Sequence, residues 1–103
     1  MKSKFEIWLE KVNEIRKEYW EKNFSYKEYT PLSVSKGRKY IKLMDENTIW
    51  GFVSMYEGIN QGTIVKKGDL LKPAGKNSPA AHSRGNIFDG TDMWEFFGPK
   101  YLK

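Results

Sequence analysis

The chain has 103 residues and a formal net charge of +5, with 18 Lys and Arg residues against 13 Asp and Glu residues. This length fits one domain with a single modest core and leaves no room for a separate catalytic module. The lack of cysteine excludes a disulfide scaffold, a cysteine-ligated zinc site and a thiol nucleophile. We expect one domain, residues 1–103, in the reducing environment of a cytoplasm.

Residues 4–23 are predicted to form an amphipathic helix. Ser3 and Glu6 have the spacing of a capping box, in which each side chain bonds the backbone N–H of the other residue. Apolar residues then repeat at steps of three and four, which is typical of a helix that faces a core. The members of this stripe are Phe5, Trp8, Val12, Ile15 and Tyr19, widened by Leu9 and Trp20. No apolar run resembles a signal peptide or a bilayer span, so no membrane partner is expected.

The following segment is predicted to form a small sheet. Alternating apolar residues around Pro31 indicate an extended segment or edge strand between residues 24 and 37. Residues 38–44 and 48–55 are rich in β-branched and aromatic side chains and flank a turn, so they predict a hairpin.

The remaining residues predict shorter elements. Residues 57–62 indicate a loop, and residues 63–65 and 70–72 indicate short strands. An aromatic tail around Gly98 and Pro99 is expected to fold back on the sheet. The predicted fold class is therefore α+β: a long N-terminal helix on a small antiparallel meander formed within residues 26–103, with an irregular C-terminal tail.

Residues 72–88 form a polar loop with few large apolar side chains. It contains the only histidine and two of the four prolines, together with glycines that let a ligand approach the backbone. Cations and backbone N–H groups at this spacing favour an anionic ligand. The candidate ligand-binding residues are Lys72, Lys76, Ser78, His82, Ser83, Arg84 and Asn86. The competing structural interpretation is a rigid loop in which Arg84 pairs with Asp89 or Asp92.

Catalysis, metal binding and cofactor binding find little support in the same residues. His82 lacks a visible partner set for acid/base work, and no Ser/His/Asp context activates Ser78 or Ser83. Asp89, Asp92 and Glu95 match no established metal motif. We therefore expect a protein without enzymatic activity, metal or cofactor.

A second basic cluster lies upstream of this loop. Its cations, Lys36, Arg38, Lys39 and Lys42, are candidate nucleic-acid contacts, and they join the loop cations into a basic stripe. Tyr40 and Trp50 are candidate rings for stacking on bases.

Several motifs in the C-terminal half resemble a family of small, mostly uncharacterised tailed-bacteriophage proteins. The motifs include Ile49-Trp50-Gly51-Phe52-Val53, Gly68-Asp69-Leu70-Leu71-Lys72-Pro73-Ala74 and Pro79-Ala80-Ala81-His82-Ser83-Arg84-Gly85-Asn86-Ile87-Phe88. The chain departs from the family at residues 75–78, where the family has a segment with a tryptophan. The resemblance implies a phage origin and a role in the host cytoplasm during infection, such as host takeover or counter-defence, and it carries no agreed activity.

Three functions follow from these patterns. The first is capture of a phosphate-bearing small molecule, such as a nucleotide or a nucleotide-type immune signal. The second is binding of nucleic acid by the basic stripe with aromatic stacking. The third is inhibition of a host protein through the aromatic tail or the exposed helix face.

Overall fold

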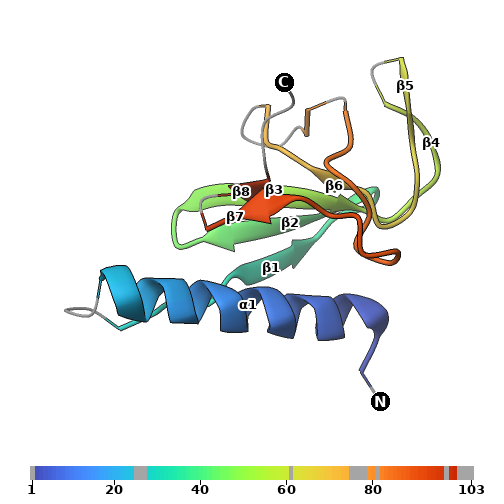
Figure 1. Ribbon diagram of the computed structural model, residues 1–103. Coiled ribbons are helices and arrows are strands. Elements are labelled where there is room, and N and C mark those ends of the chain that lie inside the picture. The colour runs from blue at the N-terminus through green and yellow to red at the C-terminus, as the bar shows by residue number, and fades with distance from the viewer. Residues whose placement is uncertain are drawn as a thin grey trace.

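An N-terminal helix lies across one face of an antiparallel sheet (Figure 1). The computed structural model describes residues 2–24, 28–60, 62–74, 79–80, 82–96 and 98–99. Helix α1 (Lys4–Asn23) starts with the predicted capping box. The Glu6 N–H donates to Ser3 Oγ at 3.1 Å, and the Ser3 N–H donates to Glu6 Oε1 at 3.2 Å. The prediction for this helix, including both of its ends, is confirmed.

The buried face of α1 differs from the predicted apolar stripe. Trp8, Val12 and Arg16 are the buried residues of the helix, whereas Ile15 and Tyr19 are each 42% exposed. The stripe was wrong at these two positions because Arg16, four residues after Val12, continues the buried row toward the C-terminal end of the helix. The long Arg16 side chain fills a space that the pattern assigns to apolar residues.

Four strands form the main sheet in the order β1-β2-β3-β6, and all neighbours are antiparallel. They are β1 (Ser33–Lys36), β2 (Tyr40–Asp45), β3 (Thr48–Ser54) and β6 (Leu70–Leu71). The predicted hairpin is confirmed as β2 and β3, with a register shift between Leu43 and Met44. Its turn places Glu46 at φ 55°, a left-handed conformation that is uncommon for a residue with a side chain.

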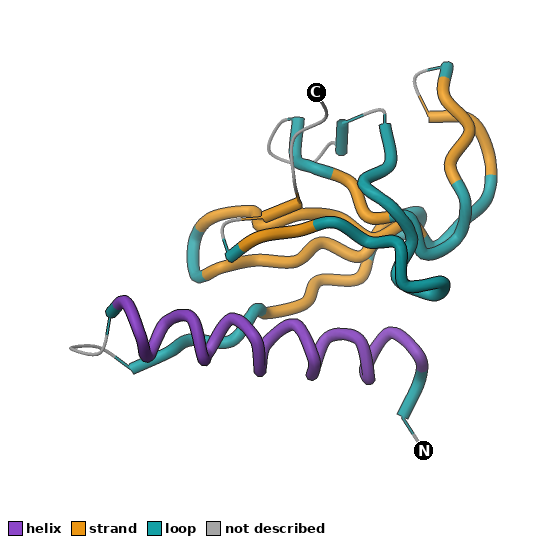
Figure 2. Tube along the Cα trace, in the orientation of Figure 1, coloured by secondary structure: helices purple, strands orange, loops and turns teal. Residues whose placement is uncertain are grey.

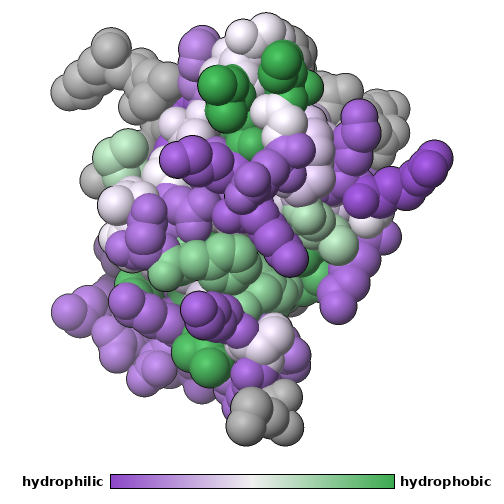
Figure 3. Space-filling view, turned by 90° about the vertical axis from the view of Figure 1, so that its right-hand side faces the viewer, coloured by the Kyte–Doolittle hydropathy of each residue, from purple (hydrophilic) through white to green (hydrophobic). Residues whose placement is uncertain are grey.

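A separate hairpin interrupts the chain between β3 and β6. It consists of β4 (Gly58–Asn60) and β5 (Thr63–Val65), and it projects away from the sheet as an arm (Figure 1). The sequence predicts β5, but it assigns residues 57–62, which include β4, to a loop because they contain two glycines and an Asn-Gln pair. Ile59 and Ile64 pair across this arm and are each 72% exposed. Figure 3 shows hydrophobic side chains gathered at this end of the molecule.

The C-terminal third is mostly loop (Figure 2). It contains one small hairpin, β7 (Trp94–Glu95) and β8 (Gly98–Pro99). The aromatic tail folds back as predicted over the described residues, since Trp94 makes an edge contact with Trp50 at 6.0 Å and Phe96 stacks on Tyr19 at 4.9 Å. Tyr101 and Leu102 lie outside the described residues.

The main core lies between α1 and the sheet. It joins side chains from the helix, from β2, β3 and β6, and from the loop after β6. Its buried members are Trp8, Val12, Leu32, Ile41, Leu43, Trp50, Val53, Leu70 and Ile87. A smaller cluster of Phe52, Val65 and Leu71 lies under the arm. The protein is thus an α+β domain with one helix-covered sheet face.

Candidate functional site

The β1–β2 turn borders a basic hollow on the sheet face that points away from α1. This hollow has a volume of about 260 Å³. It is lined by Ser35, Gly37, Arg38, Lys39, Tyr40, Lys42 and Phe52, and we call it the hairpin pocket. It brings together three of the four predicted nucleic-acid contacts and one of the two predicted stacking rings.

Strand register determines which cations reach the hairpin pocket. Ser35 pairs with Lys42 and Lys42 pairs with Phe52, so these three side chains form a row on one sheet face. Lys36 pairs with Ile41 and belongs to the opposite, helix-covered face. Hydrogen bonds from Ser3 are the main cause that lowers the pKa of Glu6 in α1, and the Lys36 charge adds to it. The structure therefore separates Lys36 from the other three predicted contacts.

The rings at the hairpin pocket are held by contacts with one another. Tyr40 packs edge to face on Phe52, with ring centroids 6.0 Å apart, and on Tyr56, at 5.7 Å. The hydroxyls of Tyr40 and Tyr56 are 3.2 Å apart, and the Lys39 ammonium lies 5.4 Å from the Tyr56 ring centroid. Burial, followed by the hydrogen bond with Tyr56, raises the pKa of Tyr40. The phenol stays neutral at physiological pH and adds no charge that would repel a phosphate.

Trp50, the other predicted stacking ring, is a core residue. It is 1% exposed, its indole N–H donates to the Phe96 carbonyl at 2.8 Å, and its ring meets the edge of Trp94. This placement leaves no open ring face for a base. The sequence suggested stacking because it cannot show which of the aromatic side chains the sheet covers.

The predicted ligand loop runs back along β6 as an irregular extra strand. The Arg84 N–H donates to the Leu70 carbonyl at 2.7 Å, and the Leu70 N–H donates to the Gly85 carbonyl at 2.9 Å. The Ala80 N–H donates to the Lys72 carbonyl at 2.6 Å. This pairing brings the charged groups of Lys72 and Arg84 to the same end of β6.

Lys72 is half-buried and Arg84 is buried. Arg84 is 8% exposed, and its guanidinium donates to the His82 carbonyl. The Lys72 ammonium donates to the Pro99 carbonyl at 2.5 Å. Burial is the main cause that lowers the pKa of Lys72, and the nearby Arg84 charge lowers it further. Burial also lowers the pKa of Arg84. The charges of Lys72 and Arg84 therefore lie close enough to repel each other at one end of β6, and the Glu95 charge acts on the Lys72 pKa in the opposite direction.

The two carboxylates that the sequence suggests as partners of Arg84 accept hydrogen bonds from other residues. Asp89 accepts hydrogen bonds from the N–H and the hydroxyl of Thr91. Asp92 Oδ2 accepts from the indole N–H groups of Trp8, at 2.9 Å, and Trp94, at 2.8 Å. Asp92 thereby joins α1 to β7, a structural role that the sequence does not reveal.

Other predicted loop residues hold the loop itself together. The Asn86 amide donates to the Lys67 carbonyl at 2.9 Å and to Asp69 Oδ1 at 3.0 Å, and its oxygen accepts from the Phe88 N–H. The Ser83 hydroxyl bonds both the N–H and the carbonyl of Gly85. These contacts favour a structural role for Asn86 and Ser83.

The remaining predicted ligand residues of the loop are His82, Lys76 and Ser78. His82 is exposed. Lys76 and Ser78 lie outside the described residues.

Arg16 is the charged residue that the sequence analysis missed. It is 1% exposed and reaches three segments: it donates to Asp45 Oδ2 at 2.9 Å, to the Tyr29 hydroxyl at 2.8 Å and to the Phe96 carbonyl at 3.1 Å. Its position four residues after Val12 on the buried face was the signal in the sequence. Buried charges are rarely isolated, so that position already called for an acidic partner.

No protein-family model, no curated protein and no solved structure matches this chain. The resemblance to tailed-phage proteins therefore stays a prediction. Among the described residues, no group of three or more His, Asp or Glu side chains converges on a possible metal position. No helix in the described ranges is long and apolar enough to cross a bilayer.

Proposed function

We propose that the protein is a non-enzymatic binder of phosphate-bearing ligands, and that single-stranded nucleic acid is the ligand of the hairpin pocket. The observation that carries this proposal is the arrangement of Arg38, Lys39 and Lys42 around one hollow beside the half-buried ring of Tyr40. Cations that follow a phosphate backbone, together with rings on which bases stack, are the common features of single-strand binding sites.

The exposure of the cations favours a chain over an enclosed small molecule. Arg38 and Lys39 are exposed at the turn, so both side chains can reach a ligand that extends beyond the hollow. The net charge of +5 adds a long-range attraction for a polyanion. On these grounds we rank nucleic acid ahead of the small-molecule ligand that the sequence alone favours.

The test is fluorescence anisotropy with a labelled single-stranded oligonucleotide over a range of salt concentrations. Three phosphate contacts predict a slope of log K against log salt of about −2. The triple variant Arg38→Ala, Lys39→Ala, Lys42→Ala is expected to lose most of the binding at low salt. A matched control, Lys17→Ala, Lys22→Ala, Lys67→Ala, removes the same charge from exposed positions outside the pocket. Equal losses in both variants, or absence of binding at low salt, would contradict the proposal.

A second candidate ligand is a nucleotide or other small phosphate at the 72–88 loop. It is favoured by the position of Lys72 and Arg84, whose charges lie near each other at one end of β6 and can both attract an anion. Calorimetric titration of Lys72→Met with mononucleotides tests it, because Lys72 is less buried than Arg84 and its loss threatens the fold less. Heat of binding equal to that of the unchanged protein would exclude this ligand site.

The biological setting of the proposal comes from the resemblance to tailed-phage proteins. We place the protein in the host cytoplasm during infection, as a factor for host takeover or counter-defence. The exposed isoleucine pair of the β4–β5 arm supports a third candidate function, which is inhibition of a host protein.

A further inference from the structure

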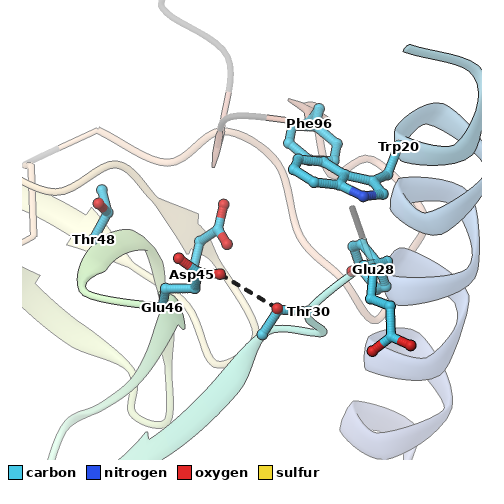
Figure 4. A pocket seen from close by; sticks show the side chains of 8 residues that line it. Trp20, Glu28, Thr30, Asp45, Glu46, Thr48 and Phe96 are labelled. Atoms are coloured by element: carbon cyan, nitrogen blue, oxygen red, sulfur yellow. Dashed lines mark hydrogen bonds between the residues drawn. The ribbon is translucent and has the colours of Figure 1, made fainter. Parts of the chain in front are cut away.

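A second hollow, of about 460 Å³, lies between the C-terminal end of α1 and the β2–β3 turn (Figure 4). Its charge is opposite to that of the hairpin pocket. The residues that matter for its chemistry are Trp20, Phe96 and Tyr29 with Glu28, Asp45 and Glu46, and we call it the acidic pocket. Its size lies within the range of small-ligand sites.

One wall of the acidic pocket is aromatic. The rings of Trp20 and Phe96 are stacked, with centroids 5.8 Å apart and an angle of 16° between their planes. Figure 4 shows these rings on the helix side of the hollow, across from the acidic residues of the β2–β3 turn. The faces of aromatic rings carry partial negative charge, so they attract cations, and most strongly where water is excluded.

The protein already binds one organic cation at this wall, and that cation is its own Arg16 side chain. The guanidinium carbon lies 4.3 Å from the Phe96 ring centroid and 5.5 Å from that of Tyr29. The same group pairs with Asp45 at 2.9 Å. Within this chain, the combination of ring and carboxylate thus already holds one guanidinium.

The positive charge of Arg16 does not balance the negative charges of the carboxylates in the pocket. The carboxylates of Glu28, Asp45 and Glu46 set against the single Arg16 guanidinium give an excess of two negative charges. Glu28 and Glu46 are exposed, and Glu46 also accepts a hydrogen bond from the Thr30 hydroxyl at 3.3 Å. Such an excess in a chain of net charge +5 favours a positively charged ligand.

The spacing of the carboxylates favours an organic cation over a metal ion. Among the described residues, no three acidic or histidine side chains converge closely enough to hold a metal. A hard cation such as Ca²⁺ requires several oxygens around one point. A guanidinium or ammonium on a carbon chain needs only separate contacts along the rings and the rim.

We propose that the acidic pocket binds an alkylguanidinium or alkylammonium group, with the half-buried Trp20 ring against its hydrocarbon part and with Glu28 and Glu46 at its charge. Asp45 serves as the inner anchor that holds Arg16 in place. This site is distinct from the hairpin pocket, and the proposal does not depend on nucleic-acid binding.

The experiment is an NMR titration of the ¹⁵N-labelled protein with agmatine, a free alkylguanidinium. The Trp20 indole N–H and the Thr48 amide report on the pocket, and the Trp8 and Trp94 indoles serve as internal references because Asp92 holds both away from it. We expect saturable shifts at Trp20 and Thr48 without matching shifts at Trp8 and Trp94. Absence of saturable shifts at Trp20 and Thr48 with agmatine, and also with the arginine peptide described below, would overturn the proposal.

Matched variants test the role of the rim carboxylates. Glu28→Gln with Glu46→Gln is expected to weaken agmatine binding about tenfold, as the loss of two partly screened ion pairs predicts. Glu18→Gln with Glu57→Gln removes the same charge from exposed positions outside the pocket. Binding that weakens equally in both double variants would show attraction to overall charge only and would overturn the site. Asp45 is left unchanged because its loss would leave the buried Arg16 without its carboxylate.

A second arm of the titration separates the two sources of such a cation. It uses a short glycine peptide with one central arginine, which presents the same guanidinium on a polypeptide. Tighter binding of the peptide than of agmatine would assign the pocket to an arginine side chain of a protein partner. Equal or weaker binding would assign it to a free amine or guanidine. Failure of both probes to shift Trp20 refutes the inference.

Discussion

Replacement of Gly85 by alanine tests whether the Arg84-Gly85-Asn86 run has a mainly structural role. Gly85 has φ +92°, and a Cβ built on it would lie 1.9 Å from the Thr91 carbonyl oxygen and 2.7 Å from Asp92 Cα. These neighbours are backbone atoms, so no side-chain rotation can relieve the overlap. Gly90, five residues later, has φ +78° and nothing within 4 Å of such a Cβ.

The two glycines therefore separate backbone strain from steric overlap. A left-handed conformation costs alanine roughly 1–2 kcal/mol, and this cost applies to both Gly85→Ala and Gly90→Ala. The reduced entropy of the unfolded chain returns about 0.4–1 kcal/mol, again in both variants. Overlap with the Thr91 backbone adds roughly 1–3 kcal/mol or more in Gly85→Ala alone. A domain of this size has a free energy of unfolding of about 5–15 kcal/mol, so the loss is large.

The assay is thermal and urea denaturation followed by circular dichroism. Each kcal/mol lowers Tm by roughly 4–8 °C in a domain near this length. Gly85→Ala is expected to melt well below Gly90→Ala, and Gly90→Ala only slightly below the unchanged protein. If the two variants melt together, the loop does not pack on the Thr91 backbone as described, and the structural explanation of this run is wrong.

Three further predictions concern single side chains. Because the pKa of Tyr40 is raised in the folded state, the unfolded chain releases that proton first, so the free energy of unfolding falls as pH rises above about 10. Urea titrations should show a shallower fall for Tyr40→Phe, and an unchanged slope would contradict the burial of the phenol. Glu46→Asn is expected to raise the free energy of unfolding by roughly 0.5–1 kcal/mol, because asparagine tolerates the left-handed turn better; a lower Cm would argue against strain there. Arg16→Met is expected to cost roughly 2–4 kcal/mol through lost hydrogen bonds and a broken ion pair, whereas a loss under 1 kcal/mol in the same assay would show that Arg16 is replaceable.

The elements that the sequence predicts well are those whose signals are local. The Ser3 and Glu6 capping box and a three-to-four residue repeat determine α1 without reference to the rest of the chain. The β2–β3 hairpin is likewise set by two β-rich segments and a two-residue turn between Asp45 and Thr48. Local hydrogen bonds and side-chain periodicity act over a few residues, so a pattern in the sequence records them directly.

The features that the sequence does not predict depend on contacts between distant segments. The local pattern does not show what the Arg16 guanidinium contacts, because Asp45 lies 29 positions away and Phe96 lies 80 positions away. Trp50 is indistinguishable in sequence from an exposed stacking ring until Phe96 and Trp94 cover it. The hairpin pocket was partly predictable because its cations are close in sequence. Only the strand register shows that Lys36 and Lys42 lie on opposite faces of the sheet.

The two proposed sites lie at opposite ends of one strand, and this placement predicts that they act independently. The hairpin pocket includes Tyr40 and the acidic pocket includes Asp45, the first and last residues of β2. A strand of that length separates them by roughly 17 Å, about twice the screening length at physiological salt. Agmatine affinity should therefore be the same with and without bound oligonucleotide at physiological salt. At low ionic strength the screening length grows, and a bound polyanion should then strengthen agmatine binding. Coupling of equal size at both salt concentrations would mean that the sites communicate through the fold, for which Arg16 and Asp45 would be the first contacts to examine.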